Sequence, residues 1–286
     1  MILVTGATGS IGHHLVRHLS EAGAPFKALV RDAAKGERLG CEVVLGDFDD
    51  PGSLAAALRG VDRLLLNGTG AVPVTGEQPM IRQQKAVIDA ARVAGVAEVV
   101  KISVLDAHEG GRLSEGAHWE IEQYLKASGP AWTILQPGAF MQNFVTGSGA
   151  FSEDGHLLGL AGGARMSYID CLDIAACAAT ILTGSRVSGA THVLTGPEAL
   201  SQAEIAELMS RALGRTVRSI EVTPEEMTVR LTARGLPSRF AEDVVALWLK
   251  AATGPASRTT STVEALLGRP PRTFAEFLAD NRSAFG

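Results

Sequence analysis

Near its start the chain reads Val4-Thr5-Gly6-Ala7-Thr8-Gly9-Ser10-Ile11-Gly12. Apolar residues precede this stretch, and residues with apolar side chains at helical spacing follow it. Three glycines recur at intervals of three residues. Glycine at these places permits a tight turn, close approach of the backbone to a phosphate group, and close packing of a helix on a strand. The stretch therefore predicts a strand, a phosphate-binding loop and a helix in succession.

A loop of this kind presents backbone N–H groups at the start of a helix, where they attract negative charge. Because the strand and helix that the chemistry needs flank the loop, the pattern predicts a Rossmann-type unit that binds the pyrophosphate of a nicotinamide dinucleotide. A turn that binds nothing is the alternative. The candidate cofactor contacts in the loop are Gly6, Thr8, Gly9, Ser10, Ile11 and Gly12.

The end of the second predicted strand bears on the choice of cofactor. Dinucleotide-binding folds that use NAD place an acidic residue here, on the ribose 2′-hydroxyl. This strand ends in Arg31 followed by Asp32, and a guanidinium group can pair with a 2′-phosphate through two charge-assisted hydrogen bonds. We therefore expect NADP. Asp32 keeps NAD open, and an exposed Arg31 without a ligand is the third reading.

Two further strand ends carry candidate cofactor contacts. After the third strand, an acid can accept a hydrogen bond from the adenine amino group and an aromatic ring can border the base. The end of the fourth strand lies close to the point where the strand order reverses. These contacts are Asp47 and Phe48 after the third strand, and Asn67 and Gly68 after the fourth. Asp49 and Asp50 precede Pro51, a spacing typical of helix capping.

Short apolar runs alternate with helical patterns through the first half of the chain. The predicted strands are Ile2–Val4, Phe26–Val30, Val43–Leu45, Arg63–Leu66, Val99–Ser103 and Thr133–Gln136. The predicted helices are Gly12–Ala22, Pro51–Leu58, Met80–Ala94 and Ala117–Ala127. Such alternation predicts an α/β fold with a doubly wound parallel sheet covered on both faces.

After about Gly138 the pattern changes to a glycine-rich segment and then helices. Gly147–Gly163 is expected to be a loop with a short hairpin, and Asp173 to cap an alanine-rich helix that ends near Leu182. Ser201 and Glu204 have capping-box spacing. Further helices are expected over Pro224–Gly235, Ser238–Ala252 and Thr273–Asn281. We predict a cofactor domain over residues 1–145 with contributions from 165–195, and a smaller, mostly helical substrate lobe over 146–286.

Composition narrows the classes of partner. The chain has 286 residues, 26 Lys and Arg against 31 Asp and Glu, and a net charge of −5. Without a long basic run, direct nucleic-acid binding is not expected. The apolar stretches are strand-sized and no signal segment opens the chain, so a cytoplasmic protein without membrane contact is expected, as monomer or homodimer. Three cysteines without paired spacing are assigned structural roles.

Several segments together resemble the NmrA-like branch of the atypical short-chain dehydrogenase/reductases. The most specific lie in the tail: Gly214-Arg215, Thr223-Pro224-Glu225-Glu226, Gly235-Leu236-Pro237 and Gly268-Arg269-Pro270-Pro271-Arg272-Thr273-Phe274. Gly46-Asp47-Phe48-Asp49, Pro137 to Phe144 and Tyr168 to Ala175 are similar to earlier segments of that branch. The branch contains both reductases and proteins that bind the dinucleotide only to sense redox state.

Carbonyl reductases of the wider superfamily use a Tyr-x-x-x-Lys pair as acid. Here the matching place reads His118-Trp119-Glu120-Ile121-Glu122. His118 and Glu122 share a helix face, and their spacing resembles that of quinone, azo-dye and triphenylmethane-dye reductases. Ser103 matches the serine that neighbours the nicotinamide in related enzymes. His118 and Ser103 are therefore the candidate catalytic residues. The alternatives are a cleft-lining histidine for His118 and a simple strand-end hydroxyl for Ser103, and for Glu122 a surface ion pair.

Conjugated acceptors need little beyond placement against the hydride, because delocalisation takes up the charge. We therefore predict an NAD(P)H-dependent reductase of a quinone-like, azo or other conjugated acceptor. The alternative is a non-catalytic, redox-sensing regulator that acts through a protein partner; a sugar-nucleotide epimerase is disfavoured by the missing pair. An open apolar cavity would favour the enzyme. Candidate contacts for a small apolar or aromatic acceptor are Phe140, Met141, Asn143, Phe144 and Tyr168.

A lysine in a predicted strand and a pair of histidines in the first predicted helix are further candidates for a function. Lys101 lies in a predicted strand, where a plain strand residue and a cofactor contact are both open. His14 and His18 have the spacing of a metal-binding pair, but without a third ligand in sequence a solvated polar helix face is the preferred reading. No metal site is predicted.

Overall fold

The computed structural model describes residues 1–286 except 75, 147–150, 161–162, 186–188, 252–253 and 286. The chain divides into two compact units. The first comprises Met1–Val72, Gly76–Pro137 and Cys171–Val193, and the second comprises Pro73–Thr75, Gly138–Asp170 and Leu194–Gly286. The functional division into a cofactor domain and a substrate lobe stays a prediction.

The first unit is built on a seven-stranded sheet with the order β3-β2-β1-β4-β5-β6-β9. Its strands are β1 Ile2–Val4, β2 Phe26–Val30, β3 Val43–Leu45, β4 Arg63–Leu66, β5 Glu98–Ile102, β6 Ala131–Pro137 and β9 Ala190–Leu194. β1 pairs parallel with both β2 and β4, so Leu3 lies between Lys27 and Leu64. The strand order reverses between β1 and β4. The predicted doubly wound parallel sheet is confirmed.

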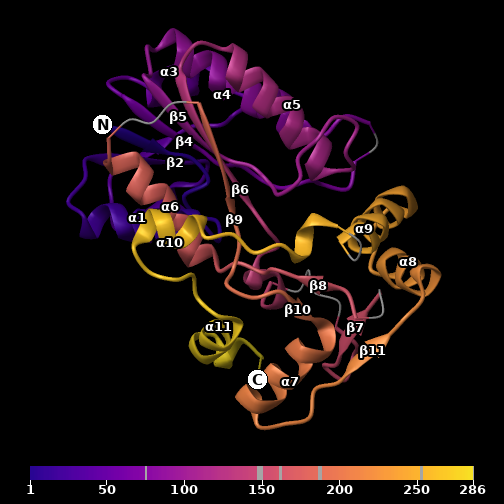
Figure 1. Ribbon diagram of the computed structural model, residues 1–286. Coiled ribbons are helices and arrows are strands. Elements are labelled where there is room, and N and C mark those ends of the chain that lie inside the picture. Colours follow the sequence, from indigo (N-terminus) through magenta and orange to yellow (C-terminus); the bar gives the residue numbers. More distant parts are fainter. Residues whose placement is uncertain (75, 147–150, 161–162, 186–188, 252–253, 286) are drawn as a thin grey trace. The chain divides into compact units, whose positions relative to one another are not determined.

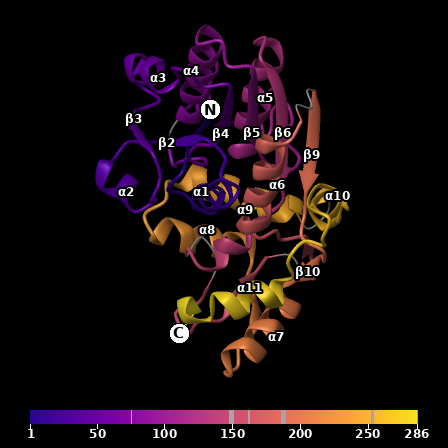
Figure 2. The same cartoon turned by 90° about the vertical axis from the view of Figure 1, so that its left-hand side faces the viewer.

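Helices cover both faces of this sheet (Figure 1). α1 Gly12–Glu21 and α6 Cys171–Thr183 pack together on one face, while α3 Pro51–Ala57, α4 Pro79–Val93 and α5 Ser114–Ala127 cover the other. Figure 2 shows the same two layers from the side, with the short α2 Ala33–Glu37 beside β2 and β3. Leu64, Ile88 and Ile121 are fully buried between β4, α4 and α5. Burial of each such side chain contributes about 1.5–3 kcal/mol.

The local predictions match the first unit closely. Four strands have the predicted bounds, and β5 begins one residue earlier than expected. The edge strand β9 was not predicted, because its polar Thr191 and His192 interrupt the apolar run. The capping role expected of Asp173 is wrong: α6 begins at Cys171, so Asp173 lies within the first turn.

The second unit is mostly helical, as predicted. Its helices are α7 Gln202–Leu213, α8 Pro224–Ala233, α9 Ser238–Ala251, α10 Thr262–Leu267 and α11 Phe274–Asp280, with short 3-10 turns at Met141–Phe144, Pro255–Ser257 and Arg282–Phe285. Two small sheets join them. β7 Leu157–Gly159 pairs parallel with β11 Ser219–Glu221, and β8 Arg165–Met166 pairs antiparallel with β10 Leu200–Ser201.

Two local predictions concern this unit. The capping box of Ser201 and Glu204 is confirmed: the serine hydroxyl accepts the Glu204 N–H, and Glu204 accepts the Ser201 N–H. The bond from the Ser201 N–H, followed by those from the Arg165 guanidinium and the Ser201 hydroxyl, lowers the pKa of Glu204 to about 2. The predicted hairpin falls partly on residues 147–150 and 161–162, which lie outside the described residues. In the described part, Phe151 and Leu157 form an antiparallel bridge.

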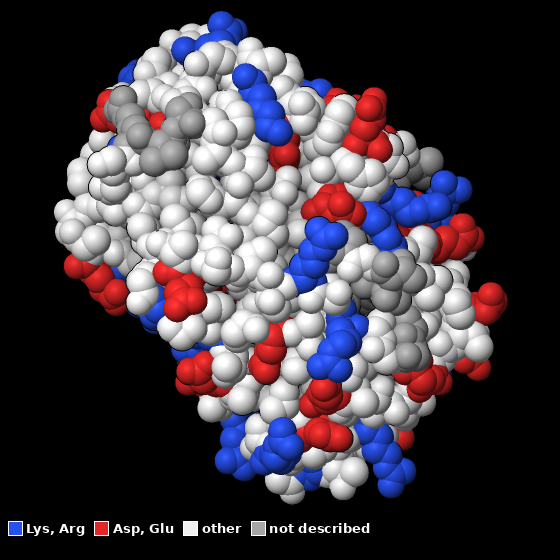
Figure 3. Space-filling view, viewed as in Figure 1, with Lys and Arg blue, Asp and Glu red and all other residues white. Residues whose placement is uncertain are grey.

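Two surface properties bear on partners. Within the described ranges, no helix combines the length and apolar character that crossing a membrane requires. On the face in Figure 3, lysine and arginine side chains are interspersed with aspartate and glutamate. That face offers no continuous basic stripe for a nucleic-acid backbone.

Candidate functional site

The phosphate loop is held between the ends of β1 and β4. The Thr5 hydroxyl lies 2.8 Å from the carbonyl oxygens of Leu65 and Asn67, and it accepts the Asn67 N–H at 2.9 Å. Thr5 is fully buried. Because these bonds join two neighbouring strands at their carboxyl ends, they fix the start of the loop against the sheet edge where ligands of such folds gather.

Two glycines of the loop occupy places that no side chain could share. Gly6 has a φ of +65°, and a Cβ there would lie 2.9 Å from the Asn67 carbonyl oxygen. At Gly12 a Cβ would lie 2.1 Å from the Gly6 carbonyl oxygen and 2.6 Å from the Ala7 Cα. The loop and the first turn of α1 are therefore packed backbone against backbone, as the glycine spacing predicts.

This packing leaves donors available. The Gly9 N–H is used inside the loop, on the Gly6 carbonyl oxygen at 3.0 Å. The N–H groups of Ser10, Ile11 and Gly12 make no hydrogen bond to any described residue. No side chain caps α1. Free N–H groups at a helix start carry partial positive charge, so the chemistry of the loop fits the pyrophosphate of a dinucleotide.

The end of β2 separates the roles of Arg31 and Asp32. The Asp32 carboxylate accepts the Ala34 N–H at 3.0 Å and caps α2. Both side chains are exposed. Asp32 is therefore engaged in a local structural contact, while the Arg31 guanidinium remains on the surface at the strand end. The contact of Arg31 with a 2′-phosphate stays a prediction, because an exposed guanidinium fits both that contact and an arginine without a ligand.

After β3, the Asp47 carboxylate accepts the Asp49 N–H at 2.9 Å, and Phe48 is half-buried against the core of the first unit. Asp50 caps α3 through the N–H groups of Gly52 and Ser53, as predicted. Asp49 does not share that role. Its carboxylate accepts a bond from Gln83 and pairs with Arg82, and these contacts, the Gln83 bond first, lower its pKa.

The loop after β4 completes this edge. Asn67 is half-buried and Gly68 exposed, and a Cβ on Gly68 would lie 3.2 Å from Gln84 Nε2 and 3.6 Å from the Phe48 ring. Gly68 therefore lies beside Phe48, in the loop after β3, and beside Gln84 of α4.

Ser103, directly after β5, belongs to a buried polar cluster with α5 and β6. Its hydroxyl donates to Glu122 Oε1 at 2.5 Å, and the Gln136 amide donates to the same oxygen at 2.9 Å. Lys126 lies 3.5 Å from Glu122 Oε2. Glu122 is only 2% exposed. Glu122 does form the ion pair of the alternative interpretation, with Lys126, but its carboxylate is buried and also accepts bonds from two neutral donors, so the pair is not a surface one.

His118 lies one helical turn before Glu122 and takes part in a second buried cluster. Its Nδ1 is 2.8 Å from the Nζ of Lys101. Lys101 Nζ also donates to Gln84 Oε1 at 3.1 Å and to the Ile102 carbonyl oxygen at 3.0 Å. Burial lowers the pKa of Lys101 to about 7, against the opposing charge of Glu122. Burial and the Lys101 charge lower the pKa of His118 well below its usual value.

From the sequence alone, Gln84 and Gln136 of these clusters are not identified, and for Lys101 a plain strand residue and a cofactor contact both stay open. Lys101 interrupts the apolar run Val99–Ile102, and a charge in the middle of a predicted central strand was the available signal. The two glutamines gave no signal. Gln84 lies within α4 and Gln136 within β6, and only the packing of those elements brings them to the cluster.

The second unit contains an apolar cavity of about 160 Å³. Phe144, Leu158, Leu160 and Trp248 supply apolar walls, and the polar lining includes Asn143, Tyr168, Gln202 and Glu221. Gln202 donates to the Tyr168 hydroxyl at 3.3 Å. Burial raises the pKa of Tyr168 to about 12, so its hydroxyl stays protonated. A cavity near 150 Å³ can hold a benzene ring.

Of the predicted acceptor contacts, Asn143, Phe144 and Tyr168 line this cavity. Met141 is 1% exposed and lies in the core of the second unit. Phe140 forms a backbone bridge with Ile169. Neither Phe140 nor Met141 lines the cavity, so their predicted contact with the acceptor finds no support in the cavity walls.

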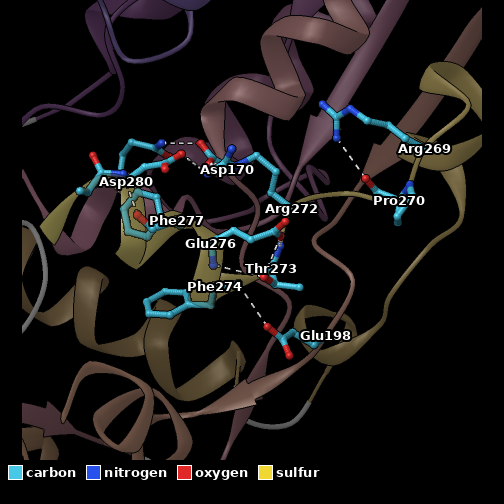
Figure 4. A network of polar contacts seen from close by, with 12 residues as sticks. Asp170, Glu198, Arg269, Pro270, Arg272, Thr273, Phe274, Glu276, Phe277 and Asp280 are labelled. Atoms are coloured by element: carbon cyan, nitrogen blue, oxygen red, sulfur yellow. Dashed lines mark hydrogen bonds and ion pairs between the residues drawn. The ribbon is translucent and has the colours of Figure 1, made fainter. Parts of the chain in front are cut away.

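The tail segment with the most specific resemblance has a structural role (Figure 4). Arg272 donates to Asp170 at 3.0 Å and to Asp280 at 2.5 Å, and Gln142 donates to the other oxygen of Asp170 at 2.7 Å. Thr273 caps α11. Arg272 thereby joins the start of α11 to the residue that precedes α6.

The remaining histidines and cysteines form no further site. The His13 and His14 rings lie 3.8 Å apart, and among the described residues no three His, Cys, Asp or Glu side chains are grouped to hold a metal ion. Cys41, Cys171 and Cys177 are not joined in disulfides.

Comparisons with known proteins identify the family of the chain and several similar proteins. Residues 1–278 match the model of the NmrA-like family. The chain is 40% identical over 291 residues to an NAD(P)H azoreductase of Xenophilus azovorans, covering 100% of this chain and 99% of the relative. It is similar to the solved Escherichia coli NADPH-dependent quinone oxidoreductase complexed with NADPH, with a TM-score of 0.85, 29% identity, and coverage of 98% and 99%. Citrobacter sp. triphenylmethane reductase complexed with NADP(H) gives a TM-score of 0.82, 28% identity, and coverage of 96% and 98%.

Proposed function

The chain belongs to the NmrA-like family, and we propose that it is an NAD(P)H-dependent reductase that transfers hydride to a quinone-like, azo or other conjugated acceptor. The observation that carries this proposal is the whole-length similarity to an NAD(P)H azoreductase. The loop and the buried clusters of the first unit supply a chemistry consistent with it.

The cofactor would be held along the carboxyl edge of the sheet. The free N–H groups of Ser10, Ile11 and Gly12 meet the pyrophosphate, and Gly6 and Gly9 let the backbone approach it. Thr8 is exposed on the same loop. Arg31 pairs with the 2′-phosphate of NADP, which is the expected cofactor, while NAD binds without that contact. Asp47, Phe48, Asn67 and Gly68 border the adenosine and its linkage.

Ser103 is suited to the nicotinamide end. Because its hydroxyl hydrogen is donated to Glu122, its oxygen is left as an acceptor. The carboxamide of a nicotinamide offers an N–H donor to such an oxygen. Glu122 and Gln136 thus orient Ser103, and they do so from inside the unit, where water competes little.

The acceptor would occupy the cavity of the second unit. Its apolar walls and its volume suit a flat aromatic or quinonoid ring, and Asn143 and Gln202 can hydrogen-bond the polar atoms of such a ring. The bound cofactor supplies the hydride. His118 supplies the proton that a quinone or azo group also needs, in place of the missing tyrosine.

The proposal is tested by turnover with a defined panel. Oxidation of NADPH and of NADH is followed with benzoquinones, naphthoquinones and azo dyes as acceptors, with His118→Ala alongside. We expect turnover, a preference for NADPH, and a lower kcat in His118→Ala. Tight cofactor binding without turnover of any acceptor would overturn the enzyme reading and favour a redox-sensing regulator.

A further inference from the structure

Lys101 is a costly residue at its position. It lies in the central strand β5, its side chain is completely buried, and apolar residues flank it. Burial of an ammonium group is unfavourable unless hydrogen bonds replace its hydration, and an apolar side chain of similar size would pack there without that cost. The strand itself gives no reason for a lysine.

The groups around Lys101 offer one hydrogen-bond acceptor for each hydrogen of its ammonium group. Three acceptors surround Nζ: Gln84 Oε1 on α4, the Ile102 carbonyl oxygen on β5, and His118 Nδ1 on α5. An ammonium group has three hydrogens and no acceptor. All three are used, and among the described residues His118 is the titratable one that Lys101 contacts directly.

This contact determines which ring nitrogen of His118 carries hydrogen. Since Nδ1 accepts from Lys101, a neutral ring carries its hydrogen on Nε2. None of the described residues hydrogen-bonds Nε2, and Nε2 is absent from the fully buried polar atoms without a partner, so it keeps slight solvent contact although His118 as a whole is only 8% exposed. His118 therefore connects the sealed Lys101 to an N–H group that no described residue engages.

We propose that Lys101 is a positioning residue that sets the tautomer of His118 and stores the proton that His118 passes to the reduced acceptor. This inference rests on the proposed function. It adds a source for the second hydrogen of the reaction, in a chain that lacks the Tyr-x-x-x-Lys pair.

The step balances as follows. A quinone or azo group that has taken a hydride, two electrons with one hydrogen, carries negative charge on oxygen or nitrogen. The Nε2–H bond of His118 breaks and a bond to that atom forms, while an Nζ–H bond of Lys101 breaks and an Nδ1–H bond forms. Lys101 is left as a neutral amine. When the product leaves, a solvent proton returns to Nε2 and the Nδ1 proton returns to Lys101.

Charges around the pair are consistent with this exchange. Burial lowers the pKa of Lys101 to about 7, while the Glu122 carboxylate on α5 opposes that shift. The low pKa of His118 keeps its ring neutral while Lys101 holds the proton. Gln84 and Gln136, the neighbours on α4 and β6, carry no charge. Because a doubly protonated His118 ring is disfavoured, Lys101 gives up its proton only as the Nε2 hydrogen of His118 leaves, so the two transfers are coupled.

Two acceptors separate a proton relay from a structural lysine. A quinone needs a hydride and a proton, whereas a cationic triarylmethyl dye becomes neutral on accepting hydride and needs no proton. We expect Lys101→Met to lower kcat for the quinone by about tenfold or more and to leave kcat for the dye within about twofold. Lys27→Met, a lysine on β2 that donates to the Arg59 carbonyl oxygen, is the matched control and should change neither rate.

Two further measurements test the relay even if Lys101→Met does not fold. Lys101→Arg retains a charge that does not dissociate, so it should show the same selective loss. In the unaltered protein, kcat for the quinone should fall as pH rises above about 7, while kcat for the dye stays level. Equal loss for both acceptors, or equal pH profiles, would overturn the relay. Absence of turnover with both acceptors in the unaltered protein would instead refute the proposed function.

Discussion

Replacement of Gly12 by alanine tests whether the phosphate loop holds the cofactor. The new Cβ would lie 2.1 Å from the Gly6 carbonyl oxygen, whereas ordinary contacts of this kind need about 3.4 Å or more. The start of α1 must therefore move by roughly 1 Å relative to the loop. A hydrogen bond near 2.9 Å that lengthens by this amount is lost.

The structure sets the size of the effect. Three N–H groups, those of Ser10, Ile11 and Gly12, face the proposed pyrophosphate. A hydrogen bond to a charged group contributes about 1.5–3 kcal/mol. Loss of one such bond raises Kd about 10- to 100-fold, and loss of a second raises it further.

Calorimetric titration with NADPH measures that Kd, and thermal melting of the same sample reports whether the variant is folded. Gly23→Ala is the matched control: it adds a methyl group near the other end of α1, at a positive φ, with nothing within 4 Å. It should lower the melting temperature slightly and leave Kd unchanged. A folded Gly12→Ala protein with the original Kd would refute the assignment of the pyrophosphate to this loop.

Three other perturbations address specificity and stability. Arg31→Ala should raise Kd for NADPH about 10- to 100-fold and leave Kd for NADH within about twofold; equal weakening of both in calorimetry would contradict the 2′-phosphate contact. Arg63→Leu should lower the free energy of unfolding in urea by about 3–5 kcal/mol, because Arg63 pairs with the fully buried Glu98 at 3.3 Å, whereas Arg92→Leu, which removes an exposed ion pair, should lower it by less than about 1 kcal/mol. Lys101 binds a proton less tightly in the folded protein, with a pKa of about 7 against the usual 10.5, so between these pH values the unfolded chain holds more protons and the free energy of unfolding rises with pH. In urea titrations from pH 7 to 10 this rise should be absent from Lys101→Met. If the free energy of unfolding depends on pH equally in both proteins, Lys101 is not the titrating group.

Local patterns in the sequence determined most of the architecture. The bounds of β1 to β4, the glycine loop and the capping box at Ser201 followed from the spacing of apolar, glycine and capping residues within short segments. Such signals act between residues that are neighbours in the chain, so they can be interpreted without knowing the fold. The prediction that the loop binds a pyrophosphate uses the same kind of local signal, since a strand and a helix on either side are part of the motif.

The buried clusters depended on tertiary structure. Gln84, Lys101 and His118 come from α4, β5 and α5, and their contacts depend on how two helices rotate on the sheet. Glu122 lies on a helix face that sequence alone could assign to solvent, yet Ser103 and Gln136 hold it inside. Charged residues are buried only where partners replace their hydration. Those partners lie far apart in the sequence, so only the packed fold identifies them.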